Sequence, residues 1–204
     1  NDNNFAVVHN GIISNYRPLR DQLKKEGCKF FSETDTEILA HLLEKFYRTS
    51  QNVEKAFVKM LNLIEGTFAL AFISSYHPEH IFCAKRESPL MLGIGDEIKF
   101  MGSDFNAFID HTKNAVILDD GEYAILSRDA YVVKNVLSKD EVTKPITKIE
   151  WDNETSKKGG YPHYMLKEIY EQPQTISTAL DLEASGLDDI VDLIAKSENV
   201  YLLG

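Results

Sequence analysis

The sequence has few cysteines and lacks any apolar run long enough to cross a membrane. Only two of its 204 residues are cysteine, Cys28 and Cys83, which excludes a disulfide framework and a Cys-x-x-C metal site. A membrane-spanning helix needs about 20 consecutive apolar residues, and neither such a segment nor a signal peptide is visible. The sequence therefore predicts a soluble, cytoplasmic, globular protein without a membrane partner.

Positive charge is also scarce. Lys and Arg together number 22 against 32 Asp and Glu, so the formal net charge is −10. A chain this acidic has no overall electrostatic attraction to nucleic acid, and we expect no nucleic-acid partner. The hydrophobic and charged shares, 43% and 26%, are those of an ordinary globular protein that can bury a core.

Apolar residues repeat at helical spacing in some segments and form short strand-like runs in others. From Val53 the apolar positions follow at offsets of 3, 4, 7, 8 and 11, which is one unbroken helix face. The same reasoning predicts helices over 16–26, 38–46, 53–64, 105–111, 163–171 and 187–194. It predicts strands over 5–8, 28–31, 67–74, 80–86, 91–95, 97–101, 115–118, 122–127, 130–136 and 200–203.

The order of these segments predicts a layered α+β fold. The run Phe68–Ile73 hardly alternates, so its strand must be covered on both faces. Closely spaced strands favour antiparallel hairpins, and hence a sheet sandwiched between helices and another sheet. A long surface loop is expected over 143–160, Pro173 is expected to end a helix, and 181–186 resembles a linker.

Few residues carry a chemical signal by pattern alone. His77 and His80 have metal-like spacing without an evident third ligand, and Gly93-Ile94-Gly95 is typical of a hairpin turn rather than a dinucleotide loop. We therefore expect no metal and no cofactor. Asn10 and Gly11 follow an apolar strand, where an amide side chain and a glycine N–H could form an oxyanion hole, although an ordinary Asn-Gly turn is favoured.

Asp35 lies at the start of a predicted helix, between Thr34 and Glu37. Thr34 and Glu37 have the spacing of a capping box, and Asp35 falls in the first turn, where the helix dipole favours an anion. An aspartate held there could equally receive the ammonium group of a substrate. From pattern alone, the capping interpretation is favoured.

Several of these segments together resemble the class II glutamine amidotransferases. The segments are Val7-Val8-His9-Asn10-Gly11-Ile12-Ile13 with Asn15-Tyr16, and Ser32-Glu33-Thr34-Asp35-Thr36-Glu37. Further segments narrow the resemblance to the isomerising glutamine–fructose-6-phosphate aminotransferases: Ser88-Pro89-Leu90, Ser103-Asp104 and Lys167-Glu168-Ile169-Tyr170-Glu171-Gln172-Pro173. The resemblance extends in order along essentially the whole chain.

The resemblance implies a fold and a set of roles. The fold would be an N-terminal-nucleophile hydrolase-type αββα sandwich, here incomplete, in which an N-terminal cysteine attacks the glutamine side-chain amide. Asn10 and Gly11 would form the oxyanion hole, and Asp35 would bind the α-amino group of L-glutamine. Ammonia would pass to fructose 6-phosphate in a sugar-isomerase (SIS) domain, giving glucosamine 6-phosphate. The family also implies a homodimer.

The chain departs from the family pattern in ways that affect these expectations. Neither Cys28 nor Cys83 is N-terminal, and the family's arginine loop for the glutamine carboxylate has no counterpart, so we expect the chain alone to be inactive. Residues 1–180 would form the glutaminase domain, 181–186 a linker and 187–204 the start of the sugar-isomerase domain. Both ends are interpreted as cut, and an unpaired sheet edge would leave the chain unstable or dimeric.

Two alternatives remain. The chain could be the glutaminase domain of another class II amidotransferase, of the phosphoribosyl-pyrophosphate or asparagine-synthesising type, because these share His-Asn-Gly. It could also be an inactive glutamine-binding or interaction module. The run Lys167–Pro173 favours the aminotransferase over the other amidotransferases.

Overall fold

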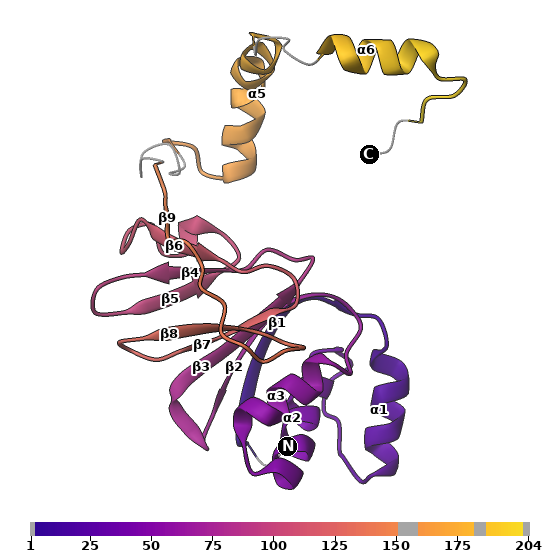
Figure 1. Cartoon of the computed structure of the whole chain (residues 1–204), viewed down its shortest axis with the longest axis vertical. Coiled ribbons are helices and arrows are strands. Elements are labelled where there is room, and N and C mark those ends of the chain that lie inside the picture. The colour runs from indigo at the N-terminus through magenta and orange to yellow at the C-terminus, as the bar shows by residue number, and fades with distance from the viewer. Residues whose placement is uncertain (1–2, 151–158, 182–186, 202–204) are drawn as a thin grey trace. The chain divides into compact units, whose positions relative to one another are not determined.

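The computed structural model describes residues 3–150, 159–181 and 187–201 (Figure 1). The chain divides into two compact units, Asn1–Asn153 and Glu154–Gly204, and each is described by itself. None of the helices in the described ranges is long and apolar enough to cross a membrane.

The first unit contains two antiparallel sheets. The five-stranded sheet has the order β1-β2-β3-β7-β8 and the four-stranded sheet the order β5-β4-β6-β9. The strands of the larger sheet are β1 (Phe5–Ile13), β2 (Gly66–Ser74), β3 (His77–Arg86), β7 (Glu122–Leu126) and β8 (Tyr131–Asn135). Those of the smaller sheet are β4 (Met91–Ile94), β5 (Lys99–Gly102), β6 (Asn114–Ile117) and β9 (Thr147–Lys148).

Three helices pack on one face of the five-stranded sheet (Figure 1): α1 (Tyr16–Lys25), α2 (Glu37–Ser50) and α3 (Val53–Leu61). The two faces of strand β2 contribute to two different cores. Its residues Phe68, Leu70 and Phe72 lie in the core shared with the helices, whereas Ala69 and Ala71 lie in the core shared with the four-stranded sheet. The predicted doubly covered strand is therefore confirmed, and the α+β class follows from it.

The outer face of the four-stranded sheet carries a smaller apolar cluster. The 3-10 helix η1 (Phe105–Ala107) replaces the longer helix predicted over 105–111, and the turns after it place Phe108 and Ile109 in this cluster. A Cβ on Gly93 of β4 would lie 2.6 Å from the Phe108 ring, so the ring packs on bare backbone. A fourth, helical layer of the sandwich stays a prediction.

The second unit contains two helices, α5 (Tyr164–Asp181) and α6 (Leu187–Lys196). The prediction that Pro173 ends the first of them is wrong, because α5 continues through this proline. Proline lacks the N–H of a helical hydrogen bond, and its ring crowds the carbonyl four residues earlier. Around this proline, the Thr175 hydroxyl donates to the carbonyls of Glu171 and Gln172.

Three other expectations need correction or lie beyond the described residues. Strand β9 interrupts the loop predicted over 143–160 by pairing with β6. Val200 and Tyr201 are not in a strand, and the rest of the strand predicted over 200–203 lies outside the described residues. The linker predicted over 181–186 also falls almost entirely outside them.

Candidate functional site

Strand β1 carries the His9-Asn10-Gly11 motif at the edge of the five-stranded sheet. The predicted Asn-Gly turn is wrong: β1 continues to Ile13 and pairs with β2 in unbroken register, with Asn10 opposite Ala69 and Gly11 opposite Phe68. Because β1 pairs only with β2, its other backbone edge has no partner strand among the described residues.

Gly11 is required by a close approach of the two strands. Its φ of +128° lies in a region that favours glycine. A Cβ at this position would lie 2.2 Å from the carbonyl oxygen of Thr67 and 2.8 Å from the Cα of Phe68. Both are backbone atoms of the neighbouring strand, so they cannot rotate away as the end of a side chain could. The backbone geometry therefore requires glycine at position 11, independently of any chemical role of this residue.

Asp35 reaches this strand from the segment before α2. Its Oδ2 accepts a hydrogen bond of 2.8 Å from the backbone N–H of Ile13. That N–H consequently points away from β2. In an antiparallel strand, the backbone N–H groups point alternately toward the partner strand and away from it. The N–H of Gly11, two residues before Ile13, therefore points to the same outer edge as the N–H of Ile13. The structure thus brings Gly11 and Asp35 to one side of β1.

The Asn10 side chain lies on the opposite face of β1 from His9, because side chains alternate along a strand. Asn10 is exposed, and its amide makes no hydrogen bond to the described part of the chain. It lines a cavity of about 190 Å³, together with Leu90, Met101 and Ser103 from the four-stranded sheet and its flanking segments. Asn10, Gly11 and Asp35 are called the β1 edge site below.

His9 lies next to the β1 edge site; in the sequence analysis it was quoted within the motif but given no role. Its side chain is only 1% exposed, and its Nδ1 lies 3.1 Å from the Thr36 hydroxyl and 3.9 Å from Oδ1 of Asp35. Burial lowers the pKa of His9, and the Asp35 carboxylate opposes that shift only in part. The sequence contained one signal for the burial of His9: in a strand, it lies an even number of residues after the core residue Phe5 and hence on the same face.

Glu37 holds the segment before α2 in place. Its carboxylate accepts hydrogen bonds from the backbone N–H groups of Phe31 and Ser32 and from the Ser32 hydroxyl. Burial acts to raise the pKa of Glu37, but these hydrogen bonds outweigh burial and lower it. The predicted Thr34–Glu37 capping box is not formed, because α2 begins after Thr36 without a side-chain cap. The strand predicted over 28–31 is replaced by irregular chain, in which the Phe31 N–H bonds to Glu37 and the Cys28 N–H to the Leu23 carbonyl.

Protein stability is expected to decrease as the pH falls from 7.5 to 5.5, because burial lowers the pKa of both His9 and His41. Well above pH 6.5, the ordinary pKa of histidine, both histidines are neutral in the folded and unfolded states. Below it the unfolded state binds protons that the folded state resists, and the free energy of unfolding decreases. Urea unfolding at the two pH values measures the change.

His9→Asn should reduce this pH dependence and leave the part that His41 contributes, because asparagine does not titrate. His163→Gln is the matched control, since His163 is an exposed histidine of the second unit. An equal pH dependence in the wild type and His9→Asn would assign the decrease to other groups.

The two cysteines lie away from the β1 edge site. Cys83 is completely buried, and burial raises the pKa of its thiol to about 12. Cys28 is half-buried and packs against the core beneath the helices. Neither lines the cavity at Asn10. In the ranges that the structure describes, no three metal-ligating side chains come together.

Comparison with known proteins gives consistent results. Residues 1–110 match the family described as "Glutamine amidotransferase domain". The chain is 44% identical, over 98% of its length, to the glutamine–fructose-6-phosphate aminotransferase [isomerizing] of Thermococcus kodakarensis. It is 45% identical, over 86% of its length, to the enzyme of the same name from Aquifex aeolicus. It covers 33% and 29% of these two proteins, so it spans about a third of their length.

Solved structures share the fold. The glutamine phosphoribosylpyrophosphate (PRPP) amidotransferase from B. subtilis, in complex with ADP and GMP, aligns with a TM-score of 0.57 and 23% identity. The alignment covers 67% of this chain and 30% of that one. This shared fold is consistent with the predicted α+β class. From the family match over more than half of its residues, the chain belongs to the glutamine amidotransferase domain family.

Proposed function

We propose that the β1 edge site binds L-glutamine. In this proposal the Asp35 carboxylate pairs with the α-amino group, and the Asn10 amide and Gly11 N–H hold the oxyanion that forms when the side-chain amide is attacked. The observation that carries the proposal is the hydrogen bond from the Ile13 N–H to Asp35, which places a carboxylate beside the edge of β1 that has no partner strand in the described ranges. An oxyanion-hole donor of this kind contributes about 10²–10³-fold in rate.

The whole protein is proposed to be an isomerising glutamine–fructose-6-phosphate aminotransferase. The names of the relatives support this activity, and their greater length supports a fructose 6-phosphate site outside this chain. The domain boundaries proposed are 1–180 for the glutaminase domain, 181–186 for a linker and 187–204 for the start of a sugar-isomerase domain. A cytoplasmic homodimer without cofactor completes the proposal.

The nucleophile is proposed to come from outside these 204 residues. Catalysis by cysteine requires a thiolate. The raised pKa of Cys83, about 12, argues against this residue, and the packing of Cys28 against the helical core argues against the other. What the chain provides is the recognition of glutamine and the stabilisation of the reaction intermediate.

Asp35→Asn tests the role of the carboxylate, because the amide oxygen can still accept the Ile13 hydrogen bond while the negative charge is lost. Glutamine added to the ¹⁵N-labelled chain should shift the backbone amide signals of Gly11 and Ile13 saturably. Asp35→Asn should weaken binding at least tenfold, since a hydrogen bond to a charged group contributes about 1.5–3 kcal/mol.

Asp21→Asn is the matched control. Asp21 is an exposed carboxylate on α1, and its substitution changes the net charge by the same amount. The proposal is contradicted if Gly11 and Ile13 do not respond to glutamine, or if Asp35→Asn and Asp21→Asn bind it equally well.

A further inference from the structure

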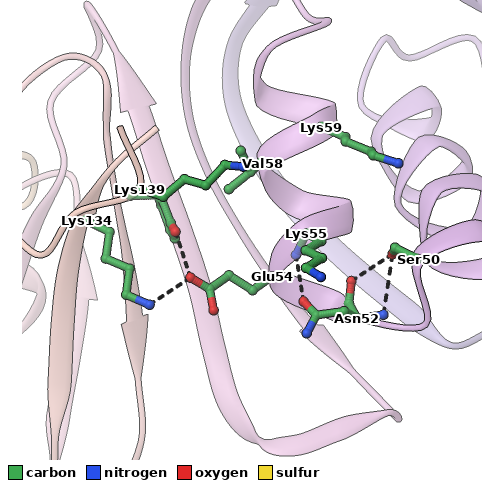
Figure 2. Close-up of a pocket in the computed structure, with 9 residues that line it drawn as sticks. Ser50, Asn52, Glu54, Lys55, Val58, Lys59, Lys134 and Lys139 are labelled. Carbon is green, nitrogen blue, oxygen red and sulfur yellow. Dashed lines mark hydrogen bonds and ion pairs between the residues drawn. The ribbon is translucent and has the colours of Figure 1, made fainter. Parts of the chain in front are cut away.

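A second concave site lies between α3 and the β7–β8 hairpin, and none of its residues belongs to the β1 edge site (Figure 2). The segment from the end of α2 through α3 forms one wall, and β7, β8 and the turn after β8 form the other. The volume is about 360 Å³, enough for a small organic molecule. It is called the α3 pocket below.

The α3 pocket contains one carboxylate, and its charge is already compensated. Tyr123 Oη donates a hydrogen bond of 2.7 Å to Oε1 of Glu54, and Lys134 Nζ donates one of 2.9 Å to the same oxygen (Figure 2). Burial acts to raise the pKa of Glu54, but the bonds from Lys134 and Tyr123 outweigh it and lower the pKa. Glu54 is therefore ionised and paired with Lys134 at neutral pH.

Three further lysines line the α3 pocket without a carboxylate to match them. Lys55, Lys59 and Lys139 form no ion pair within the described ranges of the chain. Figure 2 shows the amine of Lys59 pointing away from the pocket wall at Lys139. Lys55 on α3 and Lys139 in the turn after β8 come from the two walls of the pocket, so these two lysines are assigned to the ligand. Uncompensated positive charge in a concave site is notable in a chain whose net charge is −10.

Lys139 is held in an unusual backbone conformation at this position. Its φ is +67°, in the left-handed region, which costs a residue with a side chain about 1–2 kcal/mol. The preceding turn is fixed by Asn135, whose side-chain oxygen accepts from the N–H groups of Leu137 and Ser138. In Figure 2 the Lys139 side chain extends across the pocket toward Val58 on α3.

We propose that the α3 pocket binds a phosphate monoester, which is an activity separate from the glutamine site. Lys55 and Lys139 pair with the phosphate, whose charge at pH 7 is about −1.5 to −2. The carbon part of the ligand packs on the apolar wall at Val58. Apolar wall cannot bind an anion, but covering it with the carbon part of the ligand is favourable.

Titration of the complete 204-residue chain with phenyl phosphate tests the proposal. The methyl signals of Val58 should shift saturably in ¹H–¹³C spectra. Lys55→Gln/Lys139→Gln should weaken binding at least tenfold, because two charge-assisted hydrogen bonds are lost. Lys24→Gln/Lys25→Gln removes the same charge from exposed positions on α1 and should leave binding unchanged. Circular dichroism checks that both double variants are folded.

Two further probes separate the sources of affinity. Inorganic phosphate should bind more weakly than phenyl phosphate, and phenol should not shift the Val58 signals. The proposal is overturned if phenyl phosphate gives no saturable shift at millimolar concentration. It is also overturned if inorganic phosphate binds equally well, or if both double variants lose affinity to the same extent.

Discussion

Glutamine incubated with the purified 204-residue chain is expected to remain intact, with glutamate released at least about 10⁴-fold more slowly than by an enzyme that has its nucleophile in place. The geometry explains the size of the effect. Cys83 is fully buried and its thiol has a pKa of about 12, so almost none of it is thiolate at neutral pH. Cys28 packs against the core beneath the helices.

A coupled glutamate dehydrogenase assay measures the release. Cys28→Ser and Cys83→Ser serve as controls, and each should give the same background as the unmodified chain. Rapid release that disappears in Cys28→Ser would identify that thiol as the nucleophile and contradict the prediction. Binding of glutamine, followed by the amide signals of Gly11 and Ile13, can persist even when hydrolysis does not occur.

Gly11→Ala is expected to be the most destabilising single substitution in β1. The new Cβ would lie 2.2 Å from the Thr67 carbonyl oxygen. The alanine would also have to keep the φ of +128° that Gly11 has. Both problems involve backbone, so either β1 separates from β2 or both strands shift. We expect a loss of about 4 kcal/mol or more, which is the range of severe backbone strain and overpacking.

Gly121→Ala is the matched control for this experiment. Gly121 also has a positive φ, of +80°, but a Cβ there would meet no atom within 4 Å. Its substitution therefore includes the backbone strain without the collision, at a cost of about 1–2 kcal/mol. Urea unfolding of both variants gives the difference. Equal losses of stability would show that β1 and β2 can adjust to a Cβ at Gly11.

Regular elements with strong periodicity could be predicted from the sequence. The unbroken apolar face that begins at Val53 gave α3, and the lack of alternation from Phe68 to Ile73 gave a strand buried on both sides. Predictions from local residue patterns were wrong at positions whose conformation depends on other parts of the fold. Pro173 is accommodated inside a helix, and Asn10-Gly11 lies within a paired strand rather than a turn.

The candidate site shows the same limit. Motif resemblance selected Asn10, Gly11 and Asp35, whereas local pattern alone favoured a turn and a helix cap. The contact between Asp35 and the Ile13 N–H joins residues 22 positions apart, and no periodicity encodes it. His9 was quoted within the motif but given no role for a related reason, because its burial and its contact with Thr36 exist only once the segment before α2 has packed against β1.

The position of β1 at a sheet edge gives its backbone amides two competing uses. An N–H group that is free to stabilise a reaction intermediate is equally free to pair with a strand from another molecule. Val8 and Ile12, each 67% exposed, add apolar surface to this edge, and the strand contains no lysine or proline to discourage pairing. If the proposed function is correct, the same backbone N–H groups serve glutamine chemistry and leave β1 open to pairing with another strand. A strand that paired with this edge would then also block the proposed glutamine site.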